Sequence, residues 1–204
     1  MSLNAQVEAR EHASLWRSLD EVLVTEELSK RPSRKPDAYI EACAVEAIVE
    51  VQQAEPDVIM QRLADILMLT CHADSAGISV LKGEGADACF VWPAIAGKFS
   101  QKKGSGLSRW ASPCGVVLDQ RRPLLFQRPE FHFPYGAPVD PPIFEALLAP
   151  FYIDDRPRGT VWVVAHSPTT KFDAEDARML TRLTEYAAGA VQRLNDPIIT
   201  NHGR

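Results

Sequence analysis

Cysteine is the residue type in this sequence best suited to nucleophilic, redox or metal chemistry. The four cysteines, Cys43, Cys71, Cys89 and Cys114, stand far apart and form no C-x-x-C pair. The one histidine next to a cysteine is His72, whereas zinc sites combine several Cys and His residues at short spacings. The spacing therefore predicts four free thiols and no metal site. Cys43 and Cys71 fall on helical patterns, where a free cysteine usually packs as a small buried residue.

Cys114 is the thiol most suggestive of function. It stands in Ser112-Pro113-Cys114-Gly115 at a predicted helix start, where the helix dipole favours a thiolate. No histidine or second cysteine is adjacent in sequence to activate it, so a buried residue that fixes the loop is the favoured interpretation. Only Cys89 could approach it for two-cysteine redox chemistry. We therefore predict no catalytic residue and keep a thiol redox enzyme as the alternative.

Aromatic residues recur from Trp92 to Trp162, and a ring-lined wall suits a flat or apolar ligand. Arg109, beside Trp110, is the best candidate to pair with an anionic ligand group. His132 lies between Phe131 and Phe133, and its imidazole could bind haem iron or a ligand acid. Ordinary packing of a loop on its own core is the alternative for all of them. The candidate ligand-binding residues are Trp92, Arg109, Trp110, Cys114, His132, Phe133, Tyr135 and Trp162.

The overall charge argues against a nucleic-acid or membrane partner. The formal net charge is −5, so no overall positive field exists to hold phosphate groups. No apolar run of about 18 residues could span a membrane, and Glu8 and Arg10 interrupt the place of a signal peptide. These features predict a cytoplasmic protein. One basic cluster lies in a proline-containing connector and is interpreted as a solvated linker: Lys30, Arg31, Arg34 and Lys35.

Apolar residues recur at helical spacing in three segments of the first third of the chain. Helices are predicted over residues 12–29, over residues 37–54, and from Pro56 to about Cys71. Proline suits the first helical position because its missing N–H would be unpaired there in any case. The expected divisions of the chain are a helical arm with its connector at 1–36, the domain at 37–195, and a disordered tail at 196–204.

Two β-hairpins are predicted after the third helix, where the apolar period changes from helical to extended. The first joins strands at 76–81 and 89–92, and the second joins strands at 144–153 and 160–165. The second turn is expected to span Asp154 to Gly159. A final helix then follows to about residue 195, with an N-cap and an acidic first turn between Phe172 and Asp176.

A long irregular region separates the two hairpins, from Gly97 to Pro142. Within it we predict a short helix at 112–119 and a short strand at 124–126. Strands joined by hairpins form an antiparallel sheet, with helices gathered on one face. Because so long a connection in a compact domain is usually functional, it is expected to roof the other face and enclose a ligand cavity. The predicted fold class is α+β.

Five segments stand in a characteristic order: ADSAGIS at 73–79, FVWPAIAG at 90–97, SPCGVVLD at 112–119, PVDPPI at 138–143 and GTVWVVAH at 159–166. Together they resemble GAF domains, in particular those associated with bacterial sensor histidine kinases. The resemblance covers about Glu26 to Gln192. It implies a GAF/PAS-like antiparallel sheet of about six strands, with helices on one face and a loop-roofed pocket on the other. GAF domains bind cyclic nucleotides, bilins, haem, metabolites or no known ligand, so the fold does not identify one.

Three branches of the GAF family can be compared with this sequence. Bilin-binding relatives attach the chromophore through a Cys followed by His, but Cys114 is followed by Gly115. The cyclic-nucleotide branch carries an Asn-Lys pair, and none precedes Lys171-Phe172. Free methionine sulfoxide reductases need redox cysteines close together, for which only Cys89 is available beside Cys114. We therefore predict a non-enzymatic sensory domain that binds an unidentified small ligand and requires no cofactor. A redox enzyme and a dimerisation-only domain are the alternatives.

The predicted helices carry more apolar stripes than one sheet face can bury. We therefore expect a parallel homodimer with its contact mainly on residues 12–54. Replacing Ile48 and Val51 with Glu is expected to dissociate it without unfolding the chain. The stripes run through Ile40, Cys43, Ala47 and Val51, and through Leu180, Leu183, Ala187, Ala190 and Leu194.

A shift of these helices is the expected route from the pocket to an output domain. The nine residues after Asn195 and the thirty-six before Asp37 leave no room for a kinase, cyclase or DNA-binding segment. The output is therefore expected in a partner such as a histidine kinase, or in sequence outside this chain.

Overall fold

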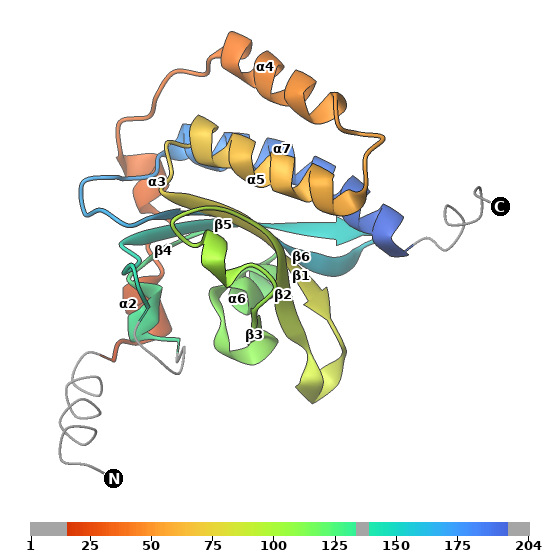
Figure 1. Cartoon of the computed structure of the whole chain (residues 1–204). Coiled ribbons are helices and arrows are strands. Elements are labelled where there is room, and N and C mark those ends of the chain that lie inside the picture. Colours follow the sequence, from red (N-terminus) through yellow and green to blue (C-terminus); the bar gives the residue numbers. More distant parts are fainter. Residues whose placement is uncertain (1–15, 134–138, 196–204) are drawn as a thin grey trace.

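The computed structural model describes residues 16–133 and 139–195 of the chain (Figure 1). Its centre is a six-stranded antiparallel sheet with the strand order β3-β2-β1-β6-β5-β4. This confirms the predicted α+β fold. The elements are α2 (Leu19–Val22), α3 (Glu27–Lys30), α4 (Ala38–Val49), α5 (Pro56–Thr70), β1 (Ser75–Lys82), β2 (Cys89–Gly97), β3 (Gly106–Ser108), α6 (Pro113–Gln120), β4 (Leu124–Gln127), β5 (Glu145–Ile153), β6 (Arg156–Ala165) and α7 (Ala174–Asn195).

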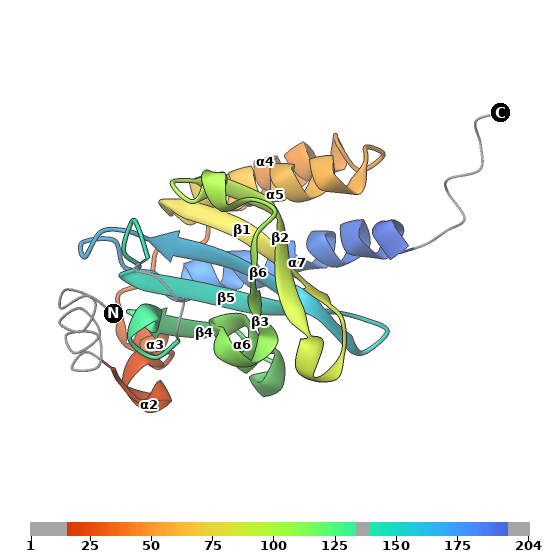
Figure 2. The same ribbon diagram turned by 60° about the horizontal axis from the view of Figure 1, so that its bottom comes forward.

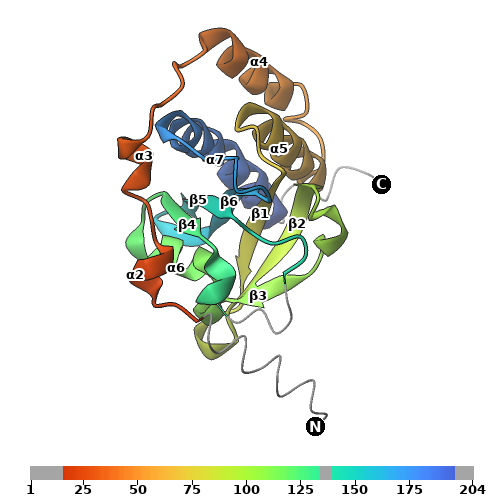
Figure 3. The same ribbon diagram turned by 90° about the vertical axis from the view of Figure 1, so that its left-hand side faces the viewer.

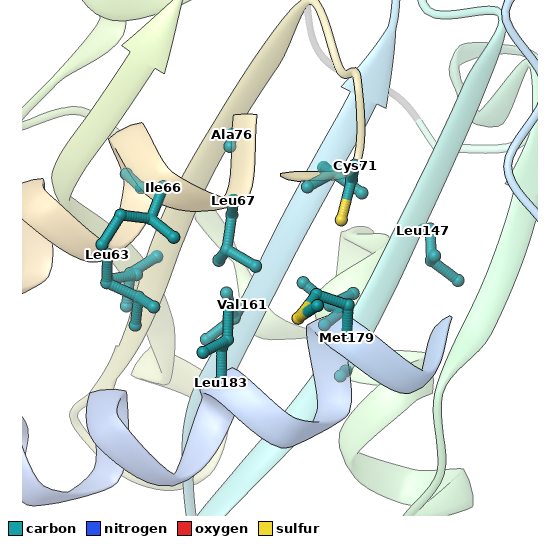
Figure 4. Packing of buried hydrophobic residues seen from close by; sticks show 14 of the residues in the cluster. Leu63, Ile66, Leu67, Cys71, Ala76, Leu147, Val161, Met179 and Leu183 are labelled. Atoms are coloured by element: carbon teal, nitrogen blue, oxygen red, sulfur yellow. The ribbon is translucent and has the colours of Figure 1, made fainter. Parts of the chain in front are cut away.

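Three helices cover one face of the sheet in two layers. Figure 3 shows α5 and α7 lying directly on the strands, with α4 outside them. Leu63 and Leu67 of α5 and Leu183 of α7 meet Val161 of β6 in the centre of this core (Figure 4). Because alternate residues of a strand face opposite sides, the odd-numbered residues of β6 point to these helices and the even-numbered ones to the other face.

The start of α7 has the N-cap that the sequence predicted. The Asp173 carboxylate accepts hydrogen bonds from the backbone N–H groups of Glu175 at 2.9 Å and Asp176 at 3.0 Å. Asp176 in turn accepts from the backbone N–H of Asp173 at 2.8 Å, which completes a capping box. These bonds fix where the helix begins, and so position its apolar face over the sheet.

The second hairpin has a shorter turn than predicted. Asp154 and Asp155 both adopt left-handed φ angles, 51° and 58°, and form the two-residue turn by themselves. Strand β6 therefore begins at Arg156 and includes Pro157. Proline is tolerated there because the pairing of β6 with β1 ends at Gly159, so its missing N–H removes no bond to β1.

The helix predicted over residues 12–29 is wrong within the described residues, while 12–15 lie outside them. Two single-turn helices, α2 and α3, are separated by an extended stretch in which Leu23 forms a β-bridge with Phe126. The backbone N–H of Val24 also donates to the Leu125 carbonyl at 2.9 Å. Figures 2 and 3 show this segment beside β4. Pairing with the open edge of β4 replaces helical hydrogen bonds, because it covers an otherwise unpaired sheet edge.

The interpretation of the basic cluster as a solvated linker is wrong for Arg31, which is mostly buried, and incomplete for Arg34, which is exposed but ion-paired. The guanidinium of Arg31 donates to both carboxylate oxygens of Glu145, each at 2.9 Å, and Glu145 is fully buried. Arg34 forms ion pairs with Asp173 and Asp176 at the start of α7. The connector is therefore held against the domain by paired charges at the ends of β5 and α7.

The apolar stripe of α4 is divided between the core and the surface. Ile48, which is 1% exposed, packs with Ala44 in the helix-side core, so a glutamate at Ile48 would disrupt the fold of one chain. The expected dissociation without unfolding is therefore wrong for this substitution. Tyr39 and Ile40 are exposed, as is Cys43, which was expected to be buried. On α7, Leu180 and Leu183 are buried, whereas the side chains of Ala187, Ala190 and Leu194 lie outside the described residues.

Candidate ligand-binding cavity

A cavity of about 280 Å³ lies on the face of the sheet opposite α5 and α7. All strands of the sheet except β4 contribute to its wall, while the start of α6 and the segments after β2 and β4 border it. Figure 1 shows α6 and the helix layers on opposite sides of the sheet. Its lining is mainly apolar, and its volume is just below the range of typical ligand sites, about 300–1,000 Å³. A compact ligand would fit.

Two of the three aromatic residues in the cavity lining are tryptophans. Trp92 of β2 and Trp162 of β6 meet edge to face, with ring centroids 6.4 Å apart. Gly77 pairs with Trp162 across the β1–β6 ladder, and a Cβ at this glycine would overlap the indole ring. The indole Nε1–H of Trp162 donates to the Ser79 hydroxyl at 3.0 Å, which satisfies its only polar group. The ring is thus fixed in position as part of a preformed wall.

Cys114 also lines the cavity, in the first turn of α6. Ser112 caps the helix, and Gly115 allows the close approach of α6 to the Arg109 carbonyl. The Cys114 thiol donates to the Ser79 hydroxyl at 3.4 Å. Burial raises the pKa of this thiol, since the charged thiolate would lose its hydration. The desolvation outweighs the helix N-terminus, and the group is a neutral thiol. All four cysteines are free, as predicted.

Two cavity residues were not found from the sequence. Ser79 is fully buried and accepts from both Trp162 and Cys114, which leaves its own hydroxyl hydrogen for a further acceptor. Lys102 is half-buried, and its ammonium lies 5.2 Å from the centroid of the Phe99 ring. It forms no ion pair with a carboxylate of the described residues. The alternation of β1 could have indicated that Ser79 faces away from Ile78, but it does not reveal which face carries a cavity.

Arg109 and Trp110, which were predicted to bind a ligand, lie outside the cavity lining. Arg109 pairs with Asp119 on α6 and stacks on Trp110, with its guanidinium carbon 4.6 Å from the ring centroid. Trp110 is 63% exposed, and its indole N–H donates to the Gly85 carbonyl at 3.1 Å. Arg109 and Trp110 thus stabilise the surface between β3 and α6.

His132 and Phe133 also lie away from the cavity lining. The His132 Nδ1 is 2.9 Å from the Arg17 carbonyl oxygen, which connects this loop to the N-terminal segment. Phe133 is buried and packs edge to face on Phe126 at 6.1 Å. Tyr135 lies outside the described residues. Of the eight candidates, the structure therefore brings together Trp92, Cys114 and Trp162.

His166 connects two of the segments that border the cavity. Its Nδ1 is 2.9 Å from the Pro142 carbonyl oxygen, and its Nε2 is 2.9 Å from the Ser75 hydroxyl. The oxygen of the same Ser75 hydroxyl accepts a hydrogen bond from the backbone N–H of Phe99, a cavity residue, at 3.1 Å. Burial lowers the pKa of His166, so the ring is neutral. Because the Pro142 carbonyl oxygen can only accept a hydrogen bond, the ring proton lies on Nδ1. The histidine thus joins these two segments.

Across residues 16–133 and 139–195, no group of three or more His, Cys, Asp and Glu side chains is arranged to hold a metal ion. None of the helices in these ranges is both long and apolar enough to span a membrane.

The sequence matches the model of one protein family, described as GAF domain, over residues 53–192. A search of curated proteins gave no match. Among solved structures, the GAF domain of a phosphoenolpyruvate-protein phosphotransferase from Acinetobacter is similar, with 13% identity and a TM-score of 0.65, covering 82% of this chain and all of that one. The GAF-B domain of DevS from Mycobacterium smegmatis has 22% identity and a TM-score of 0.52, covering 69% and 95%. Free methionine-R-sulfoxide reductase from Neisseria meningitidis has 14% identity and a TM-score of 0.57, covering 79% and 94%. At these identities the structural matches show the fold alone.

Proposed function

Because the chain belongs to the GAF domain family, we propose that it is a non-enzymatic sensory domain of bacterial signal transduction whose cavity binds a small ligand in the cytoplasm. The observation that supports this most is the tryptophan-lined cavity, in which the indole of Trp162 is fixed by Ser79. The Cys114 thiol belongs to the same wall, but its raised pKa makes it a poor nucleophile at neutral pH. The arrangement therefore suits recognition better than chemistry.

The proposal can be tested by native mass spectrometry of the protein purified from its own host. We expect a non-covalent complex with a small molecule. Ala146 lines the cavity, so Ala146→Leu fills part of it and should abolish the complex while the fold is kept. Ala42→Leu, the same change at an exposed position of α4, is the control and should keep the ligand. A complex that survives Ala146→Leu unchanged would place the ligand elsewhere and refute the proposal.

We further propose that the domain acts as a homodimer through the outer face of α4 and reports to an output partner such as a histidine kinase. Tyr39, which is 78% exposed, forms with Ile40 and Cys43 an apolar surface on this helix. Tyr39→Glu should yield monomers in sedimentation equilibrium at micromolar concentration, with an unchanged circular dichroism spectrum. Leu69→Glu, which places the same charge at an exposed apolar position of α5, is the control. A monomeric wild-type protein at this concentration would exclude the dimer.

A further inference from the structure

We propose that the ligand of this cavity is a compact apolar carboxylate whose anionic group is held by Lys102. The inference rests on the proposed function, because it names the ligand class for the same cavity. It depends on three features of the structure: the charge of the lining, the shape of the apolar wall, and the hydrogen-bonding capacity of Ser79.

The first feature is an uncompensated positive charge. Lys102 is the one charged side chain among the described residues that line the cavity. Its neighbours in the fold differ: Lys98 pairs with Asp74 at 2.7 Å, and the Lys103 ammonium donates to the Gln61 side chain at 3.2 Å. The Lys102 ammonium instead lies over the Phe99 ring, beside an apolar space in which a charge interaction is screened less than in water. A ligand anion would provide the missing partner.

The second feature is the apolar body of the cavity. Trp92 and Trp162 form an edge-to-face corner, and aliphatic side chains such as Ile95, Leu148 and Val164 complete the wall. Polar groups of a ligand placed against these side chains would lose their hydration without a partner. The small volume of about 280 Å³ adds a size limit. The wall therefore favours one ring, or a branched chain of similar size, over a nucleotide or another ligand with many polar groups.

The third feature is the small number of polar groups in the lining. The Ser79 hydroxyl is already an acceptor for Trp162 and Cys114, so it can offer a ligand only its hydrogen. The expected ligand is thus a single-charge acid with an apolar body and at most one further acceptor at the Ser79 end. The carboxylate, the body and this acceptor account for the cation, the rings and the Ser79 hydroxyl of the lining. The other hydroxyl of the lining, that of Ser105, already donates to the Lys102 carbonyl.

Three probes with the same phenyl ring and different charge test this inference: phenylacetate, phenylacetamide and 2-phenylethylamine. Their binding is followed by isothermal titration calorimetry and by the indole Nε1–H signal of Trp162 in nitrogen-15 NMR spectra. We expect phenylacetate to bind about tenfold more tightly than the amide, as a charge-assisted hydrogen bond warrants, and the amine to bind most weakly. Lys102→Met keeps the side-chain stem but removes the charge. It should lower the affinity for phenylacetate to that for the amide and leave the amide unchanged.

Lys103→Met is the matched control, because Lys103 is adjacent, exposed and absent from the lining. It should keep the preference for the acid. Equal affinity for acid and amide, an acid preference that survives Lys102→Met, or no binding of phenylacetate at millimolar concentration would each overturn the carboxylate assignment. The proposed function would still hold after any of these three outcomes if mass spectrometry finds a neutral ligand that is lost in Ala146→Leu. The two proposals therefore fail on different observations.

Discussion

Replacing Arg31 with Met tests whether the connector is held to the domain as the structure shows. Arg31 is mostly buried, and besides its two bonds to Glu145 it donates to the Phe172 carbonyl at 2.7 Å. Methionine keeps much of the apolar stem of the side chain and removes the guanidinium. The substitution therefore isolates the charge contacts between the connector and the ends of β5 and α7.

The expected loss follows from what remains around Glu145. Removing one partner of a buried ion pair costs about 3–5 kcal/mol, because the other charge is left without compensation. Here the carboxylate keeps Lys171 at 2.8 Å and the backbone N–H of Phe172 at 3.1 Å. We therefore expect the lower limit, about 3 kcal/mol in the free energy of unfolding. For a chain of this size that corresponds to a decrease in Tm of roughly 6–12 °C.

Urea unfolding followed by circular dichroism measures this free energy. The control is Lys30→Met: Lys30 is mostly exposed, its ion pairs with Glu26 and Glu27 are on the surface, and its loss should cost no more than about 0.5 kcal/mol. The double variant Arg31→Met/Glu145→Leu should be less destabilised than the sum of the two single variants. A loss below about 1 kcal/mol for Arg31→Met, or additive single effects, would refute the buried pair.

Three further predictions concern the cavity. Because burial lowers the pKa of His166, its NMR titration should have a midpoint below about 6.5. The stability that the neutral ring contributes should be complete above about pH 6.5 and should be lost as the pH falls through this midpoint. A midpoint at or above about 6.5 would contradict the buried neutral ring. Ser79→Ala leaves the Trp162 indole N–H without an acceptor and should lower the free energy of unfolding in urea by about 1–3 kcal/mol. The control Ser105→Ala, at an exposed hydroxyl, should lower it far less. Equal losses for the two variants would count against the role assigned to Ser79. Incubation with free methionine sulfoxide and a thiol reductant should give no turnover, and turnover that is lost in Cys114→Ser would reverse the non-enzymatic proposal.

The elements that the sequence predicted well are those whose local pattern agrees with their tertiary environment. The third helix, expected from Pro56 to about Cys71, is α5 over Pro56–Thr70, because its apolar stripe faces the sheet. The strands of both hairpins alternate between the two cores, and the short helix α6 and strand β4 lie where the irregular region was expected to contain them. In each case one periodicity assigns the residues of the element to their faces.

The N-terminal segment could not be predicted in this way, because its apolar residues serve two different surfaces. Val22 packs in the cavity-side core, whereas Leu28 packs in the helix-side core. Their spacing satisfies a helical pattern, but the contacts that decide the conformation are made with β4, a hundred residues away. Arg31 and Glu145 are likewise brought together only by the fold. A single sequence contains the charges but not their pairing.

The candidate site was predicted in part for a similar reason. Residue type identified Trp92 and Trp162 as possible wall residues, but it could not decide on which side of the sheet each aromatic or basic residue lies. Arg109 is neutralised by Asp119, whereas Lys102, which the sequence did not distinguish from Lys103, is the cation that lines the cavity. Side-chain direction in the segment after β2 depends on its backbone path and not on any period.

In the proposed sensory role, strands β1 and β6 connect the cavity to the helices. Trp162 and Ser79 face the cavity, while the neighbouring residue Val161 packs against α5 and α7 on the other face. A close-packed core transmits a displacement of a strand instead of absorbing it. A ligand that moved the Trp162 ring would therefore act on the packing of α7, whose start is held by Arg34 of the connector. The connector and α7 are thus the parts of the chain from which an output partner could detect that the cavity is occupied.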